Sequence, residues 1–151
     1  MKILLVEDDL SILAVTKKRL EIAGYEVITA IEGLDGLKKA RSANPHLIIL
    51  DLILPNLNGY QICGMLKRDR KYRNLPIIML TSLTKGKDAE EGFRVGADAY
   101  LTKPYDAEVL LYHIKTLLEK RYNVRLTMPA PEPTKKPKEL VKTNSSESKG
   151  K

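Results

Sequence analysis

Over its first 121 residues, the chain alternates short apolar runs with segments of helical periodicity. Runs of this length, apolar almost throughout, are typical of strands buried on both faces of a sheet. They cover residues 3–6, 25–29, 47–50, 76–80 and 99–101. The helical segments cover residues 11–23, 33–42, 58–68, 86–95 and 106–121, with Asn58 and Asp106 as expected N-caps. Strands that alternate with helices predict an α/β protein with five parallel strands and helices on both faces of the sheet.

Residues that could carry chemistry follow four of these five runs, the last of them after the intervening Thr102. They are Glu7-Asp8-Asp9, Asp51, Thr81-Ser82 and Lys103-Pro104. Because ligands of parallel α/β sheets bind outside the carboxyl ends of the strands, we expect these side chains to share one pocket. Asp9 is interpreted as a loop or helix-capping acid and not as a primary metal ligand.

The chemistry of this pocket points to a metal and a phosphoryl group. Crowded carboxylates repel one another unless a cation joins them, and an oxygen-rich set of ligands suits Mg²⁺. A metal and the Lys103 ammonium could neutralise phosphoryl oxygens, and the Thr81 hydroxyl could hydrogen-bond to one of them. Asp51 stands alone at its strand end and is the better nucleophile, whereas the adjacent Glu7 and Asp8 suit metal binding. Asp51 is also expected to be a metal ligand.

Four sequence motifs, in this order and spacing, resemble the receiver domain of bacterial two-component response regulators. They are ILLVEDD at 3–9, DLILPNLNG at 51–59, PIIMLTS at 76–82 and GADAYLTKP at 96–104. The resemblance covers residues 1–121. It implies a flavodoxin-like, CheY-like (βα)5 fold, doubly wound, with five parallel strands in the order 2-1-3-4-5.

The resemblance also implies a role for each residue on the metal side of the pocket. Asp51 would be the phosphoacceptor, and Asp8 a direct ligand of Mg²⁺. Glu7 would act on the water shell of the metal. The backbone carbonyl of Ile53 would provide a further ligand.

On the opposite side of the pocket, the resemblance implies a switch. Thr81 would hydrogen-bond to the phosphoryl group and move towards it, and Tyr100 would then turn inward. Lys103 would pair with a phosphoryl oxygen, and its bond to Pro104 is expected to be cis. The face formed by the fourth helix, the fifth strand and the last helix would change its protein partners, and it could also mediate a homodimer.

The predicted function is therefore phosphorelay signalling and not conventional catalysis. The phosphoryl donor would be a histidine kinase or a histidine phosphotransfer protein, and the output partner a protein effector. One alternative is a receiver fragment of a larger regulator or of a hybrid kinase. A second is a metal-dependent aspartyl phosphatase, but that class would want an acid at position 53, where this chain has Ile53. A nucleotide-binding flavodoxin-like protein would want a phosphate loop in place of the acids at residues 7–9.

Charge and composition bound the remaining possibilities. The net charge is +7, but residues 1–121 contribute only +3, and the last 30 residues contribute +4. A nucleic-acid partner is therefore not favoured, and the basic run at residues 67–73 is interpreted as a solvated loop.

Residues 122–151 are rich in Pro, Lys and Ser and predict a disordered tail or a linker. A single cysteine, no signal-peptide pattern and no apolar run of about 20 residues predict a cytoplasmic protein without a membrane span.

Overall fold

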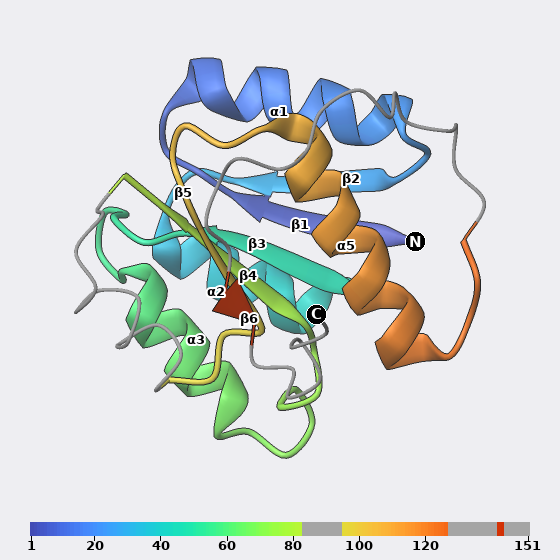
Figure 1. Ribbon diagram of the computed structural model, residues 1–151. Helices are drawn as coiled ribbons and strands as arrows, with labels where there is room; N and C mark the ends of the chain where they lie inside the picture. Colours follow the sequence, from blue (N-terminus) through green and yellow to red (C-terminus); the bar gives the residue numbers. More distant parts are fainter. Residues whose placement is uncertain (83–94, 127–141, 144–151) are drawn as a thin grey trace.

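The structure, a computed structural model, describes residues 1–82, 95–126 and 142–143 of the chain, and contains a sheet with helices on both faces (Figure 1). The strands are β1 (Lys2–Val6), β2 (Glu26–Ala30), β3 (Leu47–Asp51), β4 (Ile77–Thr81), β5 (Ala99–Thr102) and β6 (Lys142–Thr143). The helices are α1 (Leu10–Ile22), α2 (Gly33–Ser42), α3 (Gly59–Lys67) and α5 (Ala107–Tyr122). The helix predicted over residues 86–95 falls, apart from its last residue, outside the described residues.

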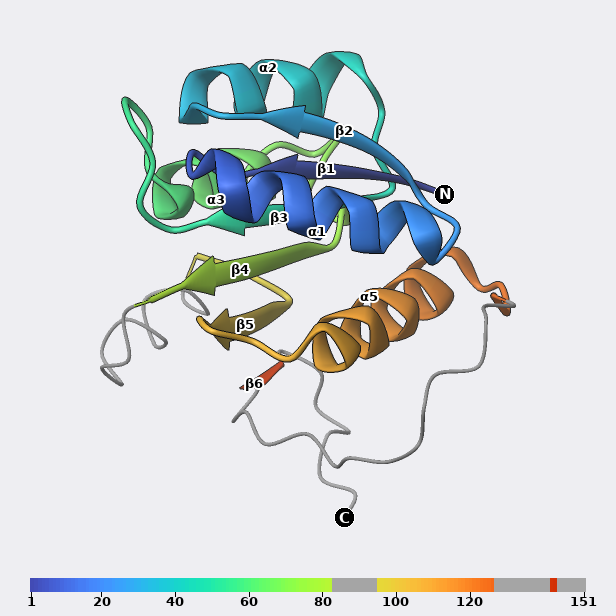
Figure 2. The same cartoon turned by 90° about the horizontal axis from the view of Figure 1, so that it is seen from above.

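The strand order confirms the predicted topology. The sheet runs β2-β1-β3-β4-β5-β6, and the pairs among β1 to β5 are all parallel. Figure 2 shows this succession from β2 at one edge to β6 at the other. The five parallel strands therefore have the order 2-1-3-4-5 and bring their carboxyl ends to one edge of the sheet.

The core lies in two layers, one on each face of the sheet. The central strands β3 and β4 are buried at every residue, as their uniformly apolar sequences predict. On one face, the strand residues pack against α1 and α5 through Leu20, Leu110 and Ile114. On the other face they pack against α2 and α3 through Leu37 and Ile62. None of the helices in the described parts of the chain is both long and apolar enough to cross a membrane.

Side-chain caps fix where three of the helices begin. The Asp9 carboxylate accepts hydrogen bonds from the backbone amides of Ser11 and Ile12, which confirms Asp9 as a helix-capping acid. Asn58 and Gln61 form a reciprocal capping box at the start of α3. Asp106 caps α5 by accepting from the amide of Glu108.

The domain continues a few residues beyond the expected boundary at residue 121. Helix α5 ends at Tyr122, whose hydroxyl donates to the carbonyl of His46 over 3.0 Å. Four residues later, the Leu126 amide donates to the Glu119 carboxylate, and the Leu126 side chain packs against the α1–α5 layer of the core. Residues 122–126 therefore pack with the folded domain and not with a disordered tail.

Two residues within the predicted tail, residues 142–143, add a strand to the sheet. Lys142 and Thr143 form β6, which pairs antiparallel with Tyr100 and Ala99 of β5. The physical reason is that β5 would otherwise be an edge strand, and an edge strand offers backbone groups to any extended segment within reach.

Lys67, the first residue of the basic run, belongs to a partly buried network and not to a solvated loop. Its ammonium donates to the carbonyls of Leu75 (2.8 Å) and Arg73 (3.1 Å) and pairs with the Asp98 carboxylate at 3.0 Å. The same Asp98 oxygen accepts from the backbone amide of Ile77 at 2.8 Å. This network joins the end of α3 to the segments that lead into β4 and β5.

We expect Asp98→Ala to lower the free energy of unfolding by about 1–3 kcal/mol, because it leaves the Ile77 amide without this acceptor and removes the charged partner of the Lys67 ammonium. Urea unfolding followed by circular dichroism measures the change. The matched control is Asp35→Ala, which breaks an exposed pair with Lys39 and should cost less than about 0.5 kcal/mol. Equal losses in the two variants would contradict a structural role for Asp98.

Candidate functional site

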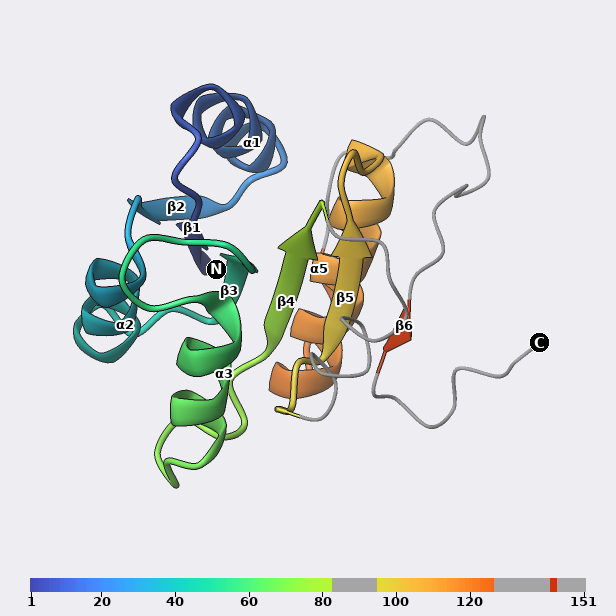
Figure 3. The ribbon, with the colours of Figure 1, turned by 90° about the vertical axis from the view of Figure 1, so that its left-hand side faces the viewer.

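The carboxyl ends of four adjacent strands carry the polar residues singled out by sequence. Glu7 directly follows β1, Asp51 and Thr81 are the last residues of β3 and β4, and Lys103 directly follows β5. The parallel register places Asp51 opposite Leu80, and Thr81 opposite Thr102. These side chains therefore lie at one edge of the sheet, and Figure 3 shows the backbone of the strands from that side.

The ammonium of Lys103 bridges two carboxylates at this edge. Its Nζ donates to Glu7 Oε1 at 2.8 Å and lies 3.4 Å from Asp51 Oδ2. Burial alone would lower the pKa of Lys103, but the hydrogen bond to Glu7 and the charge of Asp51 outweigh burial, so that the pKa is raised. Lys103 is therefore held as a cation within reach of both acids.

The carboxylates of Glu7, Asp8 and Asp51 lie close together, and their total negative charge exceeds the single positive charge of Lys103. Oxygen atoms of Glu7, Asp8 and Asp51 all lie within 4.8 Å of one another. Burial and the negative charge of Glu7 raise the pKa of Asp51 to about 6, although Lys103 opposes the shift. Glu7 and Asp51 are buried, whereas Asp8 is exposed at the mouth of the cluster. An all-oxygen set of this kind, with excess negative charge, fits a hard divalent cation.

Asp9 does not join the cluster through its carboxylate, which caps α1. Its backbone amide instead donates to Glu7 Oε2 at 3.0 Å. Glu7 thus receives one hydrogen bond on each oxygen, from Asp9 and from Lys103, and its orientation is fixed from two sides.

The loop after Asp51 turns back sharply, and Gly59 permits this turn. A β-carbon on Gly59 would lie 2.7 Å from the Asp51 carbonyl oxygen and 3.0 Å from the Leu52 α-carbon. The Gly59 amide donates to the Leu52 carbonyl at 2.8 Å, and α3 begins there. Ile53 lies within this loop with an exposed side chain, and the use of its carbonyl as a metal ligand stays a prediction.

The two residues assigned to the switch are both buried. Thr81 is inaccessible to solvent, and Tyr100 is 4% exposed and packs in the core layer beneath α2 and α3. Tyr100 pairs with Met79 across the β4–β5 ladder, two residues before Thr81. The Tyr100 ring thus already lies inward here, and the Lys103–Pro104 peptide bond is cis.

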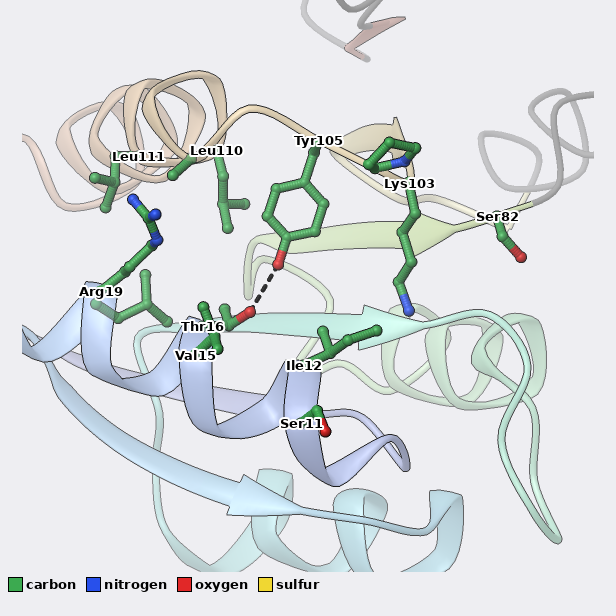
Figure 4. A pocket seen from close by; sticks show the side chains of 13 residues that line it. Ser11, Ile12, Val15, Thr16, Arg19, Ser82, Lys103, Tyr105, Leu110 and Leu111 are labelled. Atoms are coloured by element: carbon green, nitrogen blue, oxygen red, sulfur yellow. Dashed lines mark hydrogen bonds between the residues drawn. The ribbon is translucent and has the colours of Figure 1, made fainter.

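Sequence reasoning missed a contact that positions the loop carrying Lys103. The Tyr105 hydroxyl lies 2.8 Å from the hydroxyl of the buried Thr16 in α1. Figure 4 shows this contact beside Lys103, in a cavity of about 670 Å³ between α1, the β5–α5 loop and α5. Tyr105 follows Pro104 immediately, but a pairing 89 residues apart leaves no local signal in the sequence.

Comparison with known proteins agrees with this geometry. Residues 3–115 match the family model of the response regulator receiver domain. The chain is 41% identical over 119 residues to the DNA-binding dual master transcriptional regulator RpaA of Synechocystis. The aligned residues cover 79% of this chain and 49% of RpaA. It is 38% identical to Protein PilG of Pseudomonas aeruginosa, over 76% of this chain and 85% of PilG.

A solved structure gives the same result. The chemotaxis response regulator CheY4 of Vibrio cholerae superimposes with a TM-score of 0.72 at 36% identity, covering 77% of this chain and 97% of that one. The chain spans about half the length of RpaA and most of the length of PilG and CheY4. The fold, the acids at the strand ends and these matches agree, and the chain belongs to the response regulator receiver domain family.

Proposed function

We propose that this receiver domain accepts a phosphoryl group on Asp51, in the cytoplasm, from the phosphohistidine of a sensor kinase or of a histidine phosphotransfer protein. The reaction depends on Mg²⁺. The phosphorylated domain signals through altered protein contacts and does not turn over a separate substrate. It assists only its own phosphorylation and dephosphorylation.

The observation that carries this proposal is the placement of Lys103 between Glu7 and Asp51. An ammonium within 3.4 Å of the nucleophilic carboxylate is close enough to pair with an oxygen of a phosphoryl group bound there. Thr81, at the end of the neighbouring strand β4, supplies a hydroxyl on the same edge. Positioning and charge neutralisation are the main contributions that a protein makes to phosphoryl transfer.

The step itself balances without a further reactant. A carboxylate oxygen of Asp51 attacks phosphorus, a new O–P bond forms, and the N–P bond of the donor phosphohistidine breaks. The imidazole leaves with the electron pair of that bond and is reprotonated from solvent. Lys103 stays protonated throughout and pairs with a phosphoryl oxygen.

Asp8 and Asp51 would hold the metal directly, Glu7 through a water molecule, and Ile53 through its backbone carbonyl. When bound, Mg²⁺ neutralises the charge that the donor phosphoryl group adds to three carboxylates. The distances within the cluster and the raised pKa of Asp51 both support a requirement for such a cation.

The output would arise from Thr81 and Tyr100. Phosphorylation would draw Thr81 towards Asp51 and favour the inward position of Tyr100, a shift in population between accessible states. The face formed by the predicted fourth helix, β5 and α5 would then bind a protein effector or a second copy of the chain.

The alternatives have less support. Ile53 cannot protonate a leaving group, which argues against an aspartyl phosphatase. A receiver fragment of a larger regulator or of a hybrid kinase is compatible with the match to half of RpaA, and it leaves the chemistry at Asp51 unchanged.

The proposal is tested by the intact mass of the protein after incubation with Mg²⁺ and acetyl phosphate. We expect one added phosphoryl group in the wild type, none when Mg²⁺ is chelated, and none in Asp51→Asn. Asp35→Asn, a substitution of the same kind in an exposed ion pair of α2, is the matched control and should react like the wild type. Uptake by Asp51→Asn at the wild-type level would refute Asp51 as the acceptor. Failure of the wild type to accept the group from either acetyl phosphate or a phosphohistidine donor would refute the function.

A further inference from the structure

Strand β5 has a different kind of neighbour on each side. On its inner side it pairs in parallel with β4 over four residues. On its outer side it pairs antiparallel with β6, where Tyr100 lies opposite Lys142 and Ala99 opposite Thr143. Figures 2 and 3 both show β6 beyond β5, at the end of the sheet.

On its outer side, β5 presents backbone groups that a further strand can pair with. Ala99 and Leu101 are buried in the α1–α5 layer of the core, and Tyr100 is buried in the other layer. The strand has no charge, proline or bulge within residues 99–102, and these are the usual devices that protect an edge. Such an edge fits an extended peptide segment, which would recognise it through main-chain hydrogen bonds.

The sequence around β6 suits this role better than the rest of the C-terminal segment. The prolines of the segment lie at positions 129, 131, 133 and 137, and none follows. Val141 and Thr143 are β-branched and favour extended backbone. Residues 140–143 thus form the stretch of this segment best able to add a strand.

We propose that the outer edge of β5 is a docking site for an extended segment, and that the chain's own Lys142 and Thr143 occupy it. Fifteen residues separate Leu126 from Lys142, and a chain of that length spans up to roughly 50 Å when extended. Tethering makes the pairing intramolecular, and a short tether gives an effective concentration in the millimolar range. A two-residue strand can therefore compete with free peptides and with other copies for this edge.

A consequence for signalling follows, and this step rests on the proposed function. Strand β5 belongs to the proposed output face, and Tyr100 lies directly opposite Lys142. A partner that pairs with the outer edge of β5 would have to displace the C-terminal segment. The segment would then act as an intramolecular competitor for this part of the output face.

The amide of Tyr100 is the readout that the geometry singles out. The Lys103 amide donates to the Thr81 carbonyl of β4, and successive amides of a strand point to opposite sides. The Leu101 amide therefore points towards β4, and the Tyr100 amide points towards β6. Hydrogen exchange at the Tyr100 amide therefore reports on pairing with β6, and exchange at the Leu101 amide reports on pairing with β4.

The experiment measures amide exchange by NMR in the unphosphorylated chain of residues 1–151 and in Lys142→Pro/Thr143→Pro, since proline removes a backbone donor and disrupts pairing in a ladder. We expect exchange at Tyr100 to be about threefold faster or more in this variant, with Leu101 unchanged. Ser146→Pro/Ser148→Pro is the matched control, and its Tyr100 exchange should equal that of the wild type.

Two outcomes would overturn the proposal. Equal exchange at Tyr100 in the wild type and in Lys142→Pro/Thr143→Pro would show that the segment does not occupy the edge. Protection that rises with protein concentration, together with a dimer in light scattering, would assign the edge to a second copy of the chain. Because no phosphoryl donor is used, failure here is distinct from failure of the proposed function.

Discussion

Lys103→Met is expected to slow phosphoryl uptake from acetyl phosphate by about 10²–10³-fold, the loss typical when one preorganised charge-stabilising group is removed from a reaction centre. Methionine keeps the length of the side chain but removes the ammonium that lies 2.8 Å from Glu7 and 3.4 Å from Asp51. The variant would bring the charge of a phosphoryl group against three carboxylates with only the metal to balance it. Intact mass followed over time in saturating Mg²⁺ gives the rate.

The matched control is Lys115→Met, which removes an ammonium from an exposed ion pair with Glu119 on α5. It should take up the phosphoryl group at the wild-type rate. Circular dichroism must show that Lys103→Met is folded. Uptake by a folded Lys103→Met at the rate of Lys115→Met would remove Lys103 from the reaction.

The strands and the site were predictable from sequence for one reason. A parallel sheet buried on both faces requires uniformly apolar strands, so that a charged residue at the end of such a run stands out. Asp51 and Glu7 were identified in this way, and the register of β1, β3 and β4 brings their strand ends together. Local sequence was sufficient because the position of each of these residues at the sheet edge depended on where its own strand ends.

The contacts that sequence did not predict join distant segments and have no periodic signal. In the sequence, Lys67 is one of several basic residues interpreted as a solvated loop, yet its ammonium pairs with Asp98, 31 residues away. The Thr16–Tyr105 contact is of the same kind, and each partner alone is an ordinary residue on a helix or in a loop.

The strand β6 was missed for a different reason. Composition describes what a segment can bury, and the C-terminal segment can bury little. Strand addition needs only backbone and an open edge, and the edge belongs to β5, more than 40 residues earlier in the chain. A prediction from composition cannot include a partner of this kind.

Asp51→Asn is expected to stabilise the metal-free protein at pH 7 by about 1–3 kcal/mol, because it removes a carboxylate whose ionisation the folded state disfavours. Burial and the charge of Glu7 raise the pKa of Asp51 from 3.8 to about 6, so that the native state binds this proton more tightly than the unfolded state. The resulting penalty is absent below pH 3.8. It grows as the pH rises and is complete above about pH 6.

This pH dependence distinguishes the electrostatic explanation from a general gain in packing. Urea unfolding in the presence of a chelator should show Asp51→Asn more stable than the wild type at pH 7, and the two proteins equal near pH 3.5. Asp35→Asn, which alters an exposed pair, should differ little from the wild type at either pH. A stabilisation of the same size at both pH values would contradict the role assigned to charge.

Mg²⁺ should reverse the order of the two proteins. A ligand that binds only the folded state stabilises it in proportion to the logarithm of its concentration over its dissociation constant. The wild type, with three carboxylates within 4.8 Å, should gain stability steadily as Mg²⁺ is added, and Asp51→Asn, with two, should gain much less. Equal gains would mean that Asp51 is not a ligand of the metal. A larger gain in the wild type would mean that the same carboxylate destabilises the empty site and contributes to metal affinity, which is the cost expected when a fold keeps a reactive acid ready for a cation and a phosphoryl group.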